Sequence, residues 1–289
     1  MKSIVPILMT IFIILLFYSC KQYEKPAELN IIFLHHSTGR IIWNGINTPL
    51  KKKVIWRINK ELADSLEIKA RLPYYFKKYN NANNKNYMIK EQTFPKDSPY
   101  GWNNFPYDYY NIWVKNAGAE PYMEEPTLEI LTQKYDVIIF KHCFPVINIQ
   151  EDQDSSDVNS DIKTISNYKL QYSALRDKLL EFPETKFILF TGAAQAKSNA
   201  TEDEAKRAKE FFTWVINEWD VPKDNIYLWD LYSLGTQDEL YLKGEYAVSS
   251  SDSHPNNRFA RKAVKLLFNR IIDVIENNGE KTRLTGENK

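Results

Sequence analysis

Five short apolar runs, separated by helical stretches, constrain the fold of this chain more than any other feature. A continuous apolar run is typical of a parallel strand whose two faces are both covered by helices. Between and after these runs, apolar residues recur with a helical period over 166–182, 202–219 and 257–277. The apolar runs are 30–34, a weaker one at 87–89, 136–140, 186–190 and 225–229.

This alternation predicts β-α-β crossovers and therefore an α/β fold. We expect a three-layer α/β/α sandwich around a central, mostly parallel five-stranded sheet, formed by one domain over 30–277. In such sheets, ligands bind beyond the carboxyl ends of the strands. The chain has 38 basic and 37 acidic residues and a net charge of +1, which gives no field that would favour nucleic acid. No nucleic-acid partner is expected, and a monomer is predicted.

The N-terminus has the pattern of an export signal. Lys2 precedes an apolar stretch over 4–18, which is shorter than the roughly 20 residues that span a membrane. The stretch ends in Ser19-Cys20, which resembles a bacterial lipobox. We expect a lipoprotein signal peptide over 1–19, lipid attachment at Cys20, a tether over 20–29 and anchoring to a membrane of the cell envelope. A signal peptide cleaved without lipid, or an uncleaved anchor, would also export the domain. Cys143 then has no partner for a disulfide.

Two further segments stand apart from the alternating pattern. The stretch 90–127 contains five prolines and many aromatic residues, so it is predicted to be an ordered insertion rather than a disordered linker. The polar residues 278–289 are expected to form a frayed tail. The aromatic residues of the insertion are Tyr100, Trp102, Phe105, Tyr107, Tyr109, Tyr110 and Trp113.

The histidines gather where a parallel sheet places its functional loops. Only four occur in the chain, and each follows a predicted strand or precedes the last helix. Ser37 follows two of them and stands two residues before a glycine, at a predicted strand-to-helix turn that would expose its hydroxyl as a nucleophile. The alternative is that Ser37 only caps the next helix. The histidines are at positions 35, 36, 142 and 254.

A second segment supplies what a nucleophilic serine requires. Asp252 and His254 lie two residues apart in a predicted extended run, so their side chains share one side. Asp252 would accept a hydrogen bond from one ring nitrogen of His254, and the other nitrogen would take the serine proton. The alternative is a loop histidine at the start of the last helix.

A serine after the first strand and an Asp-x-His-Pro before the last helix resemble the SGNH/GDSL hydrolase superfamily, which has a flavodoxin-like sandwich. The resemblance covers most of 30–275 and implies that Ser37 is the nucleophile, His254 the base and Asp252 the acid. Two positions depart from the family pattern. His35-His36-Ser37 replaces the usual Gly-Asp-Ser, as in a divergent branch with His-His-Ser-Thr-Gly, and Ser251 stands where the family places its acid.

The resemblance also implies an oxyanion hole built from a glycine N–H and an asparagine side chain. Gly101 and Asn104 are the candidates after the second strand, and Lys141 or His142 would replace the family's asparagine after the third. No cofactor and no metal are implied. The predicted function is removal of acyl groups, such as acetyl, from a carbohydrate or another small ester at the cell envelope, through an acyl-enzyme on Ser37.

Two other functions remain open at this stage. The four histidines with Asp252 and Cys143 would form a metal-dependent hydrolase if they converged, although no usual zinc-binding spacing is present. The aromatic insertion would instead offer rings for sugar stacking in a non-catalytic, glycan-binding lipoprotein. The α/β-hydrolase fold is excluded because its serine follows several strands rather than the first.

Overall fold

The computed structural model describes residues 27–47 and 70–289. All five apolar runs form strands of one parallel sheet with the order β2-β1-β3-β4-β5, so the predicted fold class is confirmed. This is the strand order of flavodoxin-like sheets. The strands are β1 (Glu28–His35), β2 (Asn86–Thr93), β3 (Val137–Phe140), β4 (Lys186–Phe190) and β5 (Ile226–Trp229).

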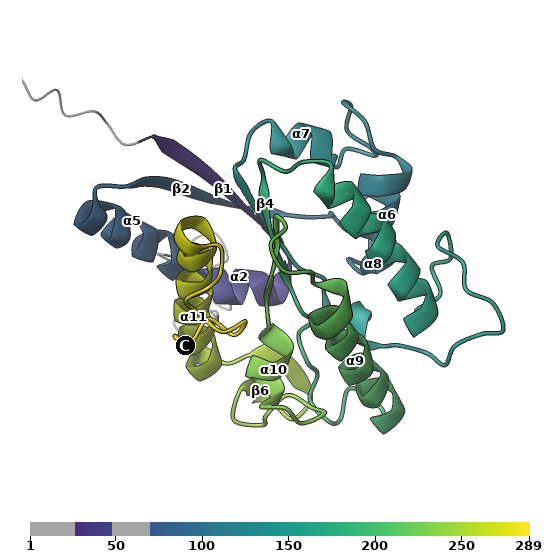
Figure 1. Ribbon diagram of the computed structural model, residues 1–289. Helices are drawn as coiled ribbons and strands as arrows, with labels where there is room; N and C mark the ends of the chain where they lie inside the picture. The colour runs from purple at the N-terminus through teal and green to yellow at the C-terminus, as the bar shows by residue number, and fades with distance from the viewer. Residues whose placement is uncertain (1–26, 48–69) are drawn as a thin grey trace, which may run out of the picture.

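Helices cover both faces of the sheet (Figure 1). One layer contains α2, α5 and α11, which contact one another, and the opposite layer contains α6, α8 and α9. The three helices expected from the apolar period are present, and the second of them ends in a π-helical turn. The helices of these layers are α2 (Ser37–Asn44), α5 (Arg71–Asn83), α6 (Pro106–Tyr110), α8 (Ile165–Leu180), α9 (Glu202–Trp214) with η3 (Val215–Trp219), and α11 (Asn257–Asn277).

The sheet interior explains why these runs are continuously apolar. Residues 31–34 of β1 and all four residues of β3 are at most 1% exposed, because helices cover both sides of each strand. Strand β1 is an inner strand and pairs with β2 on one side and β3 on the other. The loop that follows β1 therefore emerges at the carboxyl edge between the loops that follow its two neighbours.

The aromatic insertion extends the core rather than forming a surface platform. It contains α6, the π-helical turn η1 (Asn111–Lys115) and the approach to α7 (Leu128–Thr132). The Trp113 ring stacks on Phe94 at 5.0 Å between centroids and lies 5.2 Å from Phe140 of β3. Of the seven aromatic residues singled out in the sequence, Tyr100 is the most exposed, at 43%. Most of the other six aromatic residues are buried.

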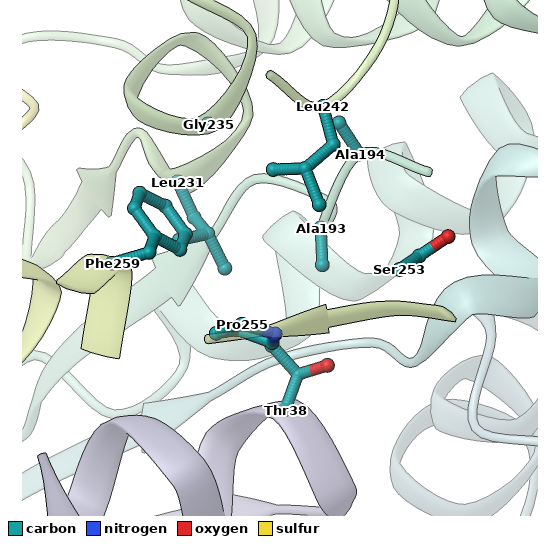
Figure 2. A pocket seen from close by; sticks show the side chains of 9 residues that line it. All are labelled: Thr38, Ala193, Ala194, Leu231, Gly235, Leu242, Ser253, Pro255 and Phe259. Atoms are coloured by element: carbon teal, nitrogen blue, oxygen red, sulfur yellow. The ribbon is translucent and has the colours of Figure 1, made fainter. Parts of the chain in front are cut away.

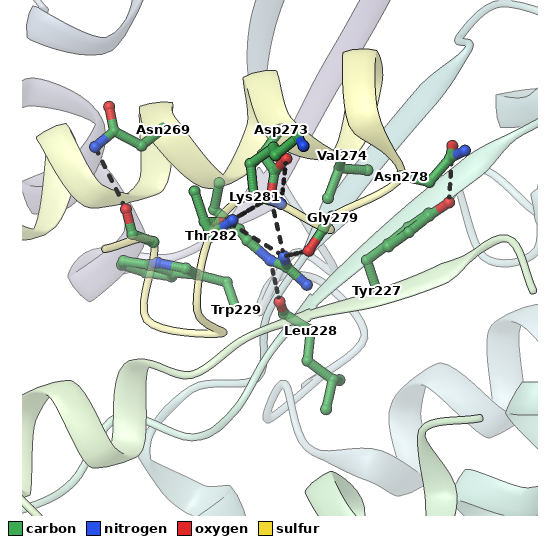
Figure 3. Close-up of polar contacts among 12 residues, drawn as sticks. Tyr227, Leu228, Trp229, Asn269, Asp273, Val274, Asn278, Gly279, Lys281 and Thr282 are labelled. Carbon is green, nitrogen blue, oxygen red and sulfur yellow. Dashed lines mark hydrogen bonds and ion pairs between the residues drawn. The ribbon is translucent and has the colours of Figure 1, made fainter. Parts of the chain in front are cut away.

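The C-terminal residues that were expected to fray are instead packed against α11 and β5 (Figure 3). The buried carboxylate of Asp273 accepts hydrogen bonds from the backbone N–H groups of Lys281 and Thr282 and from the Thr282 hydroxyl, the last at 2.6 Å. The indole N–H of Trp229 donates to the Thr285 carbonyl at 3.0 Å. The prediction of a frayed tail was wrong because polar composition does not reveal a buried acceptor that binds the tail.

The predicted signal peptide, Cys20 and most of the tether lie outside the described residues. Within 27–47 and 70–289, no helix is both long enough and apolar enough to cross a membrane.

Candidate active site

Ser37 is the first residue of α2 and is exposed to solvent. Strand β1 ends at His35, and His36 keeps an extended backbone (φ −122°, ψ −158°) before the helix begins. The first N–H groups of a helix have no partner within the helix, and the helix dipole makes this end favourable for negative charge. The first turn of α2 contains no acidic residue to occupy those groups. The local geometry therefore presents a hydroxyl beside donors that can bind an oxyanion.

His254 lies on β7 (Asp252–Pro255), a short strand that pairs antiparallel with β6 (Ala247–Ser249). The Asp252 carboxylate accepts a hydrogen bond from Nδ1 of His254 at 2.7 Å and from the His254 backbone N–H at 3.0 Å. This carboxylate holds the proton on Nδ1 and leaves Nε2 as the basic nitrogen. The structure thus places Asp252, rather than Ser251, beside the ring.

Side chains along β7 point alternately toward solvent and toward the protein interior. The side chains of Asp252 and His254 are 45% and 35% exposed, whereas Ser253 is 4% exposed and Pro255 is buried. The extended run expected from the sequence is therefore present, with both titratable groups on its solvent side.

Strand β7 packs against α2, which brings the two halves of the candidate site together. Thr38, next to Ser37, lines a small cavity together with Ser253 and Pro255 of β7 (Figure 2). The cavity encloses roughly 10 Å³, about the space of one water molecule, and its other lining residues are apolar. This contact places the helix that begins at Ser37 beside the strand that carries His254.

Phe144 forms a third side of the site. It begins η2 (Phe144–Ile147), the short 3₁₀ helix after β3, and its ring meets the His254 imidazole edge-on at 5.2 Å and 86°. In the described part of the chain, the Ser37 hydroxyl and Nε2 of His254 have no hydrogen-bond partner. In serine enzymes without substrate, the bond between nucleophile and base is often longer than in the working complex.

The glycine and the asparagine that were predicted as donors for the oxyanion hole instead donate hydrogen bonds to backbone carbonyls. The N–H of Gly101 donates to the Asp97 carbonyl at 2.5 Å within an exposed turn. The side chain of Asn104 is buried, and its Nδ2 donates to the Phe94 carbonyl at 2.6 Å. Its backbone carbonyl accepts from the N–H of Cys143 at 2.8 Å. Asn104 therefore links the loops after β2 and β3, and neither residue presents the predicted donor to the site.

Lys141 and His142 both point into the protein. The Lys141 side chain is fully buried, and its ammonium donates to the free thiol of Cys143 at 3.6 Å between Nζ and Sγ. Neither ring nitrogen of His142 has a hydrogen-bond partner within residues 27–47 and 70–289, and the Tyr109 ring packs across it at 4.5 Å. Burial, with a smaller effect of the Lys141 charge, lowers the pKa of His142 to about 3. His142 is therefore a neutral core residue, and the expectation that it supplies an oxyanion donor is not met.

His35 and His36 build the turn that carries Ser37. Nε2 of the buried His35 lies 2.9 Å from the Glu91 carboxylate, and Nδ1 donates to the His36 carbonyl at 3.1 Å. Nε2 of His36 donates to the carbonyl of Pro95. Burial lowers the pKa of both histidines despite these contacts. Sequence reasoning did not single out Glu91 or Phe144, since only the fold brings them to these histidines.

The convergence that a metal-dependent hydrolase would need is not observed in the described part of the chain. No group of three or more His, Cys, Asp or Glu side chains there is arranged to hold a metal ion. His142 lies in the core and His254 on the surface, and His35 pairs with Glu91. The residues proposed for such a site therefore lie in different parts of the structure.

Comparisons with known proteins provide no further constraint on the site. No family model matches the chain, and no curated protein and no solved structure shows significant similarity to it.

Proposed function

We propose that this protein is a serine ester hydrolase with Ser37 as nucleophile, His254 as general base and Asp252 as the group that orients the base. One observation carries the proposal. The Asp252 carboxylate lies 2.7 Å from Nδ1 of His254, Nε2 has no hydrogen-bond partner among the described residues, and both residues lie on a strand that packs against the helix beginning at Ser37. The sequence resemblance to the SGNH/GDSL hydrolases supports the same three roles.

The proposed reaction follows from these positions. Ser37 Oγ attacks the ester carbonyl carbon while its proton passes to Nε2 of His254, and the Asp252 carboxylate stabilises the imidazolium. The N–H groups in the first turn of α2 bind the oxyanion, in place of the donors at Gly101 and Asn104. His254 then protonates the leaving alcohol, and water hydrolyses the acyl-enzyme by the reverse sequence.

We further propose an acylated carbohydrate of the cell envelope as substrate, with the domain exported and lipid-anchored through Cys20. The pattern of residues 1–20 and the family resemblance support this location. The burial of Trp113, Tyr109 and their neighbours removes the main support for a non-catalytic glycan-binding protein. The geometry therefore favours an enzyme over a binding module.

The test compares four full-length proteins on 4-nitrophenyl acetate and on an acetylated polysaccharide. Ser37→Ala and His254→Ala should each lower kcat by roughly 10³-fold or more, because the nucleophile and its base act as a unit. Ser173→Ala, which changes an exposed hydroxyl on α8, is the matched control and should retain wild-type rates. A fluorophosphonate probe should label Ser37 in the wild type.

Two results would contradict the proposal. Wild-type rates in Ser37→Ala would exclude the acyl-enzyme mechanism. If activity were also lost on treatment with a chelator, the metal-dependent alternative would be favoured instead. Binding of polysaccharide without release of acetate from any ester would favour the non-catalytic alternative.

A further inference from the structure

Ser253 lies between Asp252 and His254 in the chain. Its side chain points to the buried side of β7, away from solvent. Ser253 is 4% exposed, and its Oγ accepts a hydrogen bond from the backbone N–H of Ala196 at 2.9 Å. Ala196 lies in the loop 191–201, which joins β4 to α9. The Ser253 hydroxyl therefore connects β7 to a loop at the carboxyl edge of the main sheet.

Two more hydrogen bonds from the same loop reach the turn before β7. The Ser198 hydroxyl donates to the Ser250 carbonyl, and Nδ2 of Asn199 donates to the Ser251 carbonyl at 3.2 Å. We call these two bonds and the bond to Ser253 the hairpin clamp. The clamp holds three of the four positions that surround Asp252, on both sides of it in the chain.

The strand pair that carries the site is short, and other parts of the chain hold it in place; among the described residues these include α2, the Asn47 side chain, which donates to the Pro255 carbonyl, and the hairpin clamp. Strand β6 has three residues and β7 has four, and their register is irregular between Ala247 and Ser249. A two-stranded pair of this size is marginally stable by itself. The side chains of Asp252 and His254 are too exposed for burial to fix them. Contacts made by the rest of the hairpin therefore contribute to their position.

We propose that Ser253 is a positioning residue that, through the hairpin clamp, sets the location of the Asp252–His254 pair relative to Ser37. This inference rests on the proposed ester hydrolase function. A displacement of about 1 Å in a catalytic group can reduce turnover by about 10²-fold. Loss of the Ser253 hydroxyl would also leave the buried N–H of Ala196 without an acceptor and favour such a displacement.

Two substitutions of equal shape isolate the hydroxyl. Ser253→Thr keeps it and Ser253→Val lacks it, and both add a methyl group beside the small cavity that Ser253 lines. In full-length protein with 4-nitrophenyl acetate, Ser253→Val should lower kcat at least about tenfold while KM changes less than about threefold. Ser253→Thr should restore kcat to near the wild-type value. Equal kcat in the two variants would overturn the proposal.

A spectroscopic measurement separates this inference from the proposed function. The Nδ1 proton shared by His254 and Asp252 should give a low-field proton NMR signal that persists in Ser253→Thr and is lost or broadened in Ser253→Val. If the wild type hydrolysed no ester but the signal behaved in this way, Ser253 would position the pair although the proposed function had failed. A signal unchanged in Ser253→Val would refute the positioning role.

A further variant tests the hairpin clamp in case Ser253→Val does not fold. Asn199→Ala removes one bond of the hairpin clamp from an exposed side chain and leaves the core intact. It should lower kcat about threefold or more and speed the exchange of the low-field proton, while the thermal unfolding midpoint stays near the wild-type value. Unchanged kcat and unchanged exchange in this variant would overturn the role of the clamp.

Discussion

Replacing His142 by leucine should remove a specific acid sensitivity from the fold. The imidazole is fully buried, neither nitrogen has a hydrogen-bond partner among the residues that the structure describes, and its pKa falls from 6.5 to about 3 in the folded protein. In the unfolded chain the ring regains its ordinary pKa and takes up a proton below 6.5. The folded protein therefore binds fewer protons than the unfolded chain between these two values, and acid favours unfolding there.

The magnitude follows from proton linkage. The contribution of the neutral ring to the free energy of unfolding is fully present above pH 6.5 and is lost as the pH falls toward 3. Between about pH 7.5 and about pH 5, the loss is about 2 kcal/mol, because the unfolded ring is titrated through about 1.5 pKa units at 1.36 kcal/mol each. Leucine takes up no proton, so this part of the pH dependence should vanish.

Urea unfolding, followed by tryptophan fluorescence at both pH values, measures the difference. Burial raises the pKa values of Asp108 and Asp220 to about 6, and these carboxyls oppose the effect by favouring the folded state in acid. They are present in both proteins and cancel in the comparison. Tyr172→Phe is the control, since its ring lies 5.6 Å from His142 and takes up no proton in this range. An equal pH effect in wild type and His142→Leu would refute the reasoning.

Two further substitutions test the contact of the first turn of α2 with His35 and the packing of the C-terminal segment. A Cβ atom at Gly39 would lie 2.4 Å from the Cβ of His35, so Gly39→Ala should cost about 1–3 kcal/mol of stability and reduce ester hydrolysis; an unchanged urea midpoint would contradict this. Asp273→Asn should cost about 3 kcal/mol, because it breaks the buried ion pair with Arg270 at 3.6 Å and weakens the bonds that the carboxylate accepts from Lys281 and Thr282. Limited proteolysis should then release the C-terminal residues, and continued protection of that segment would count against the assignment.

The strands could be predicted because their surroundings are uniform. Runs such as 136–140 and 186–190 are buried on both faces, so nearly every residue is apolar and the strand is visible without knowledge of its partners. Helix α5 (Arg71–Asn83) was not predicted, although Leu72, Tyr75, Phe76 and Tyr79 have the helical spacing i, i+3, i+4, i+7. Leu72 and Phe76 are buried and the two tyrosines only partly so, which makes this apolar face a weaker signal than a strand that is apolar throughout.

The same distinction applies to the candidate site. The contact between Asp252 and His254 is local, so the spacing in an extended strand was sufficient to predict it. The surroundings of His142 and Asn104 depend on residues that only the fold brings near, and no spacing in the sequence shows which way these side chains turn. Their burial was therefore not predictable from their position after a strand.

The contact between α2 and α11 also has a consequence for how the chain would acquire the proposed hydrolase activity. The backbone N–H of Asn47 bonds the Asn257 side chain at 2.9 Å across 210 positions of sequence. Closing a loop of this length is entropically costly, so such contacts form late compared with those between neighbouring strands and helices. During refolding, helical circular dichroism should therefore recover before turnover. If the protein is the proposed ester hydrolase, a fragment with most of its secondary structure would be inert, and the proposed activity would report completion of the fold.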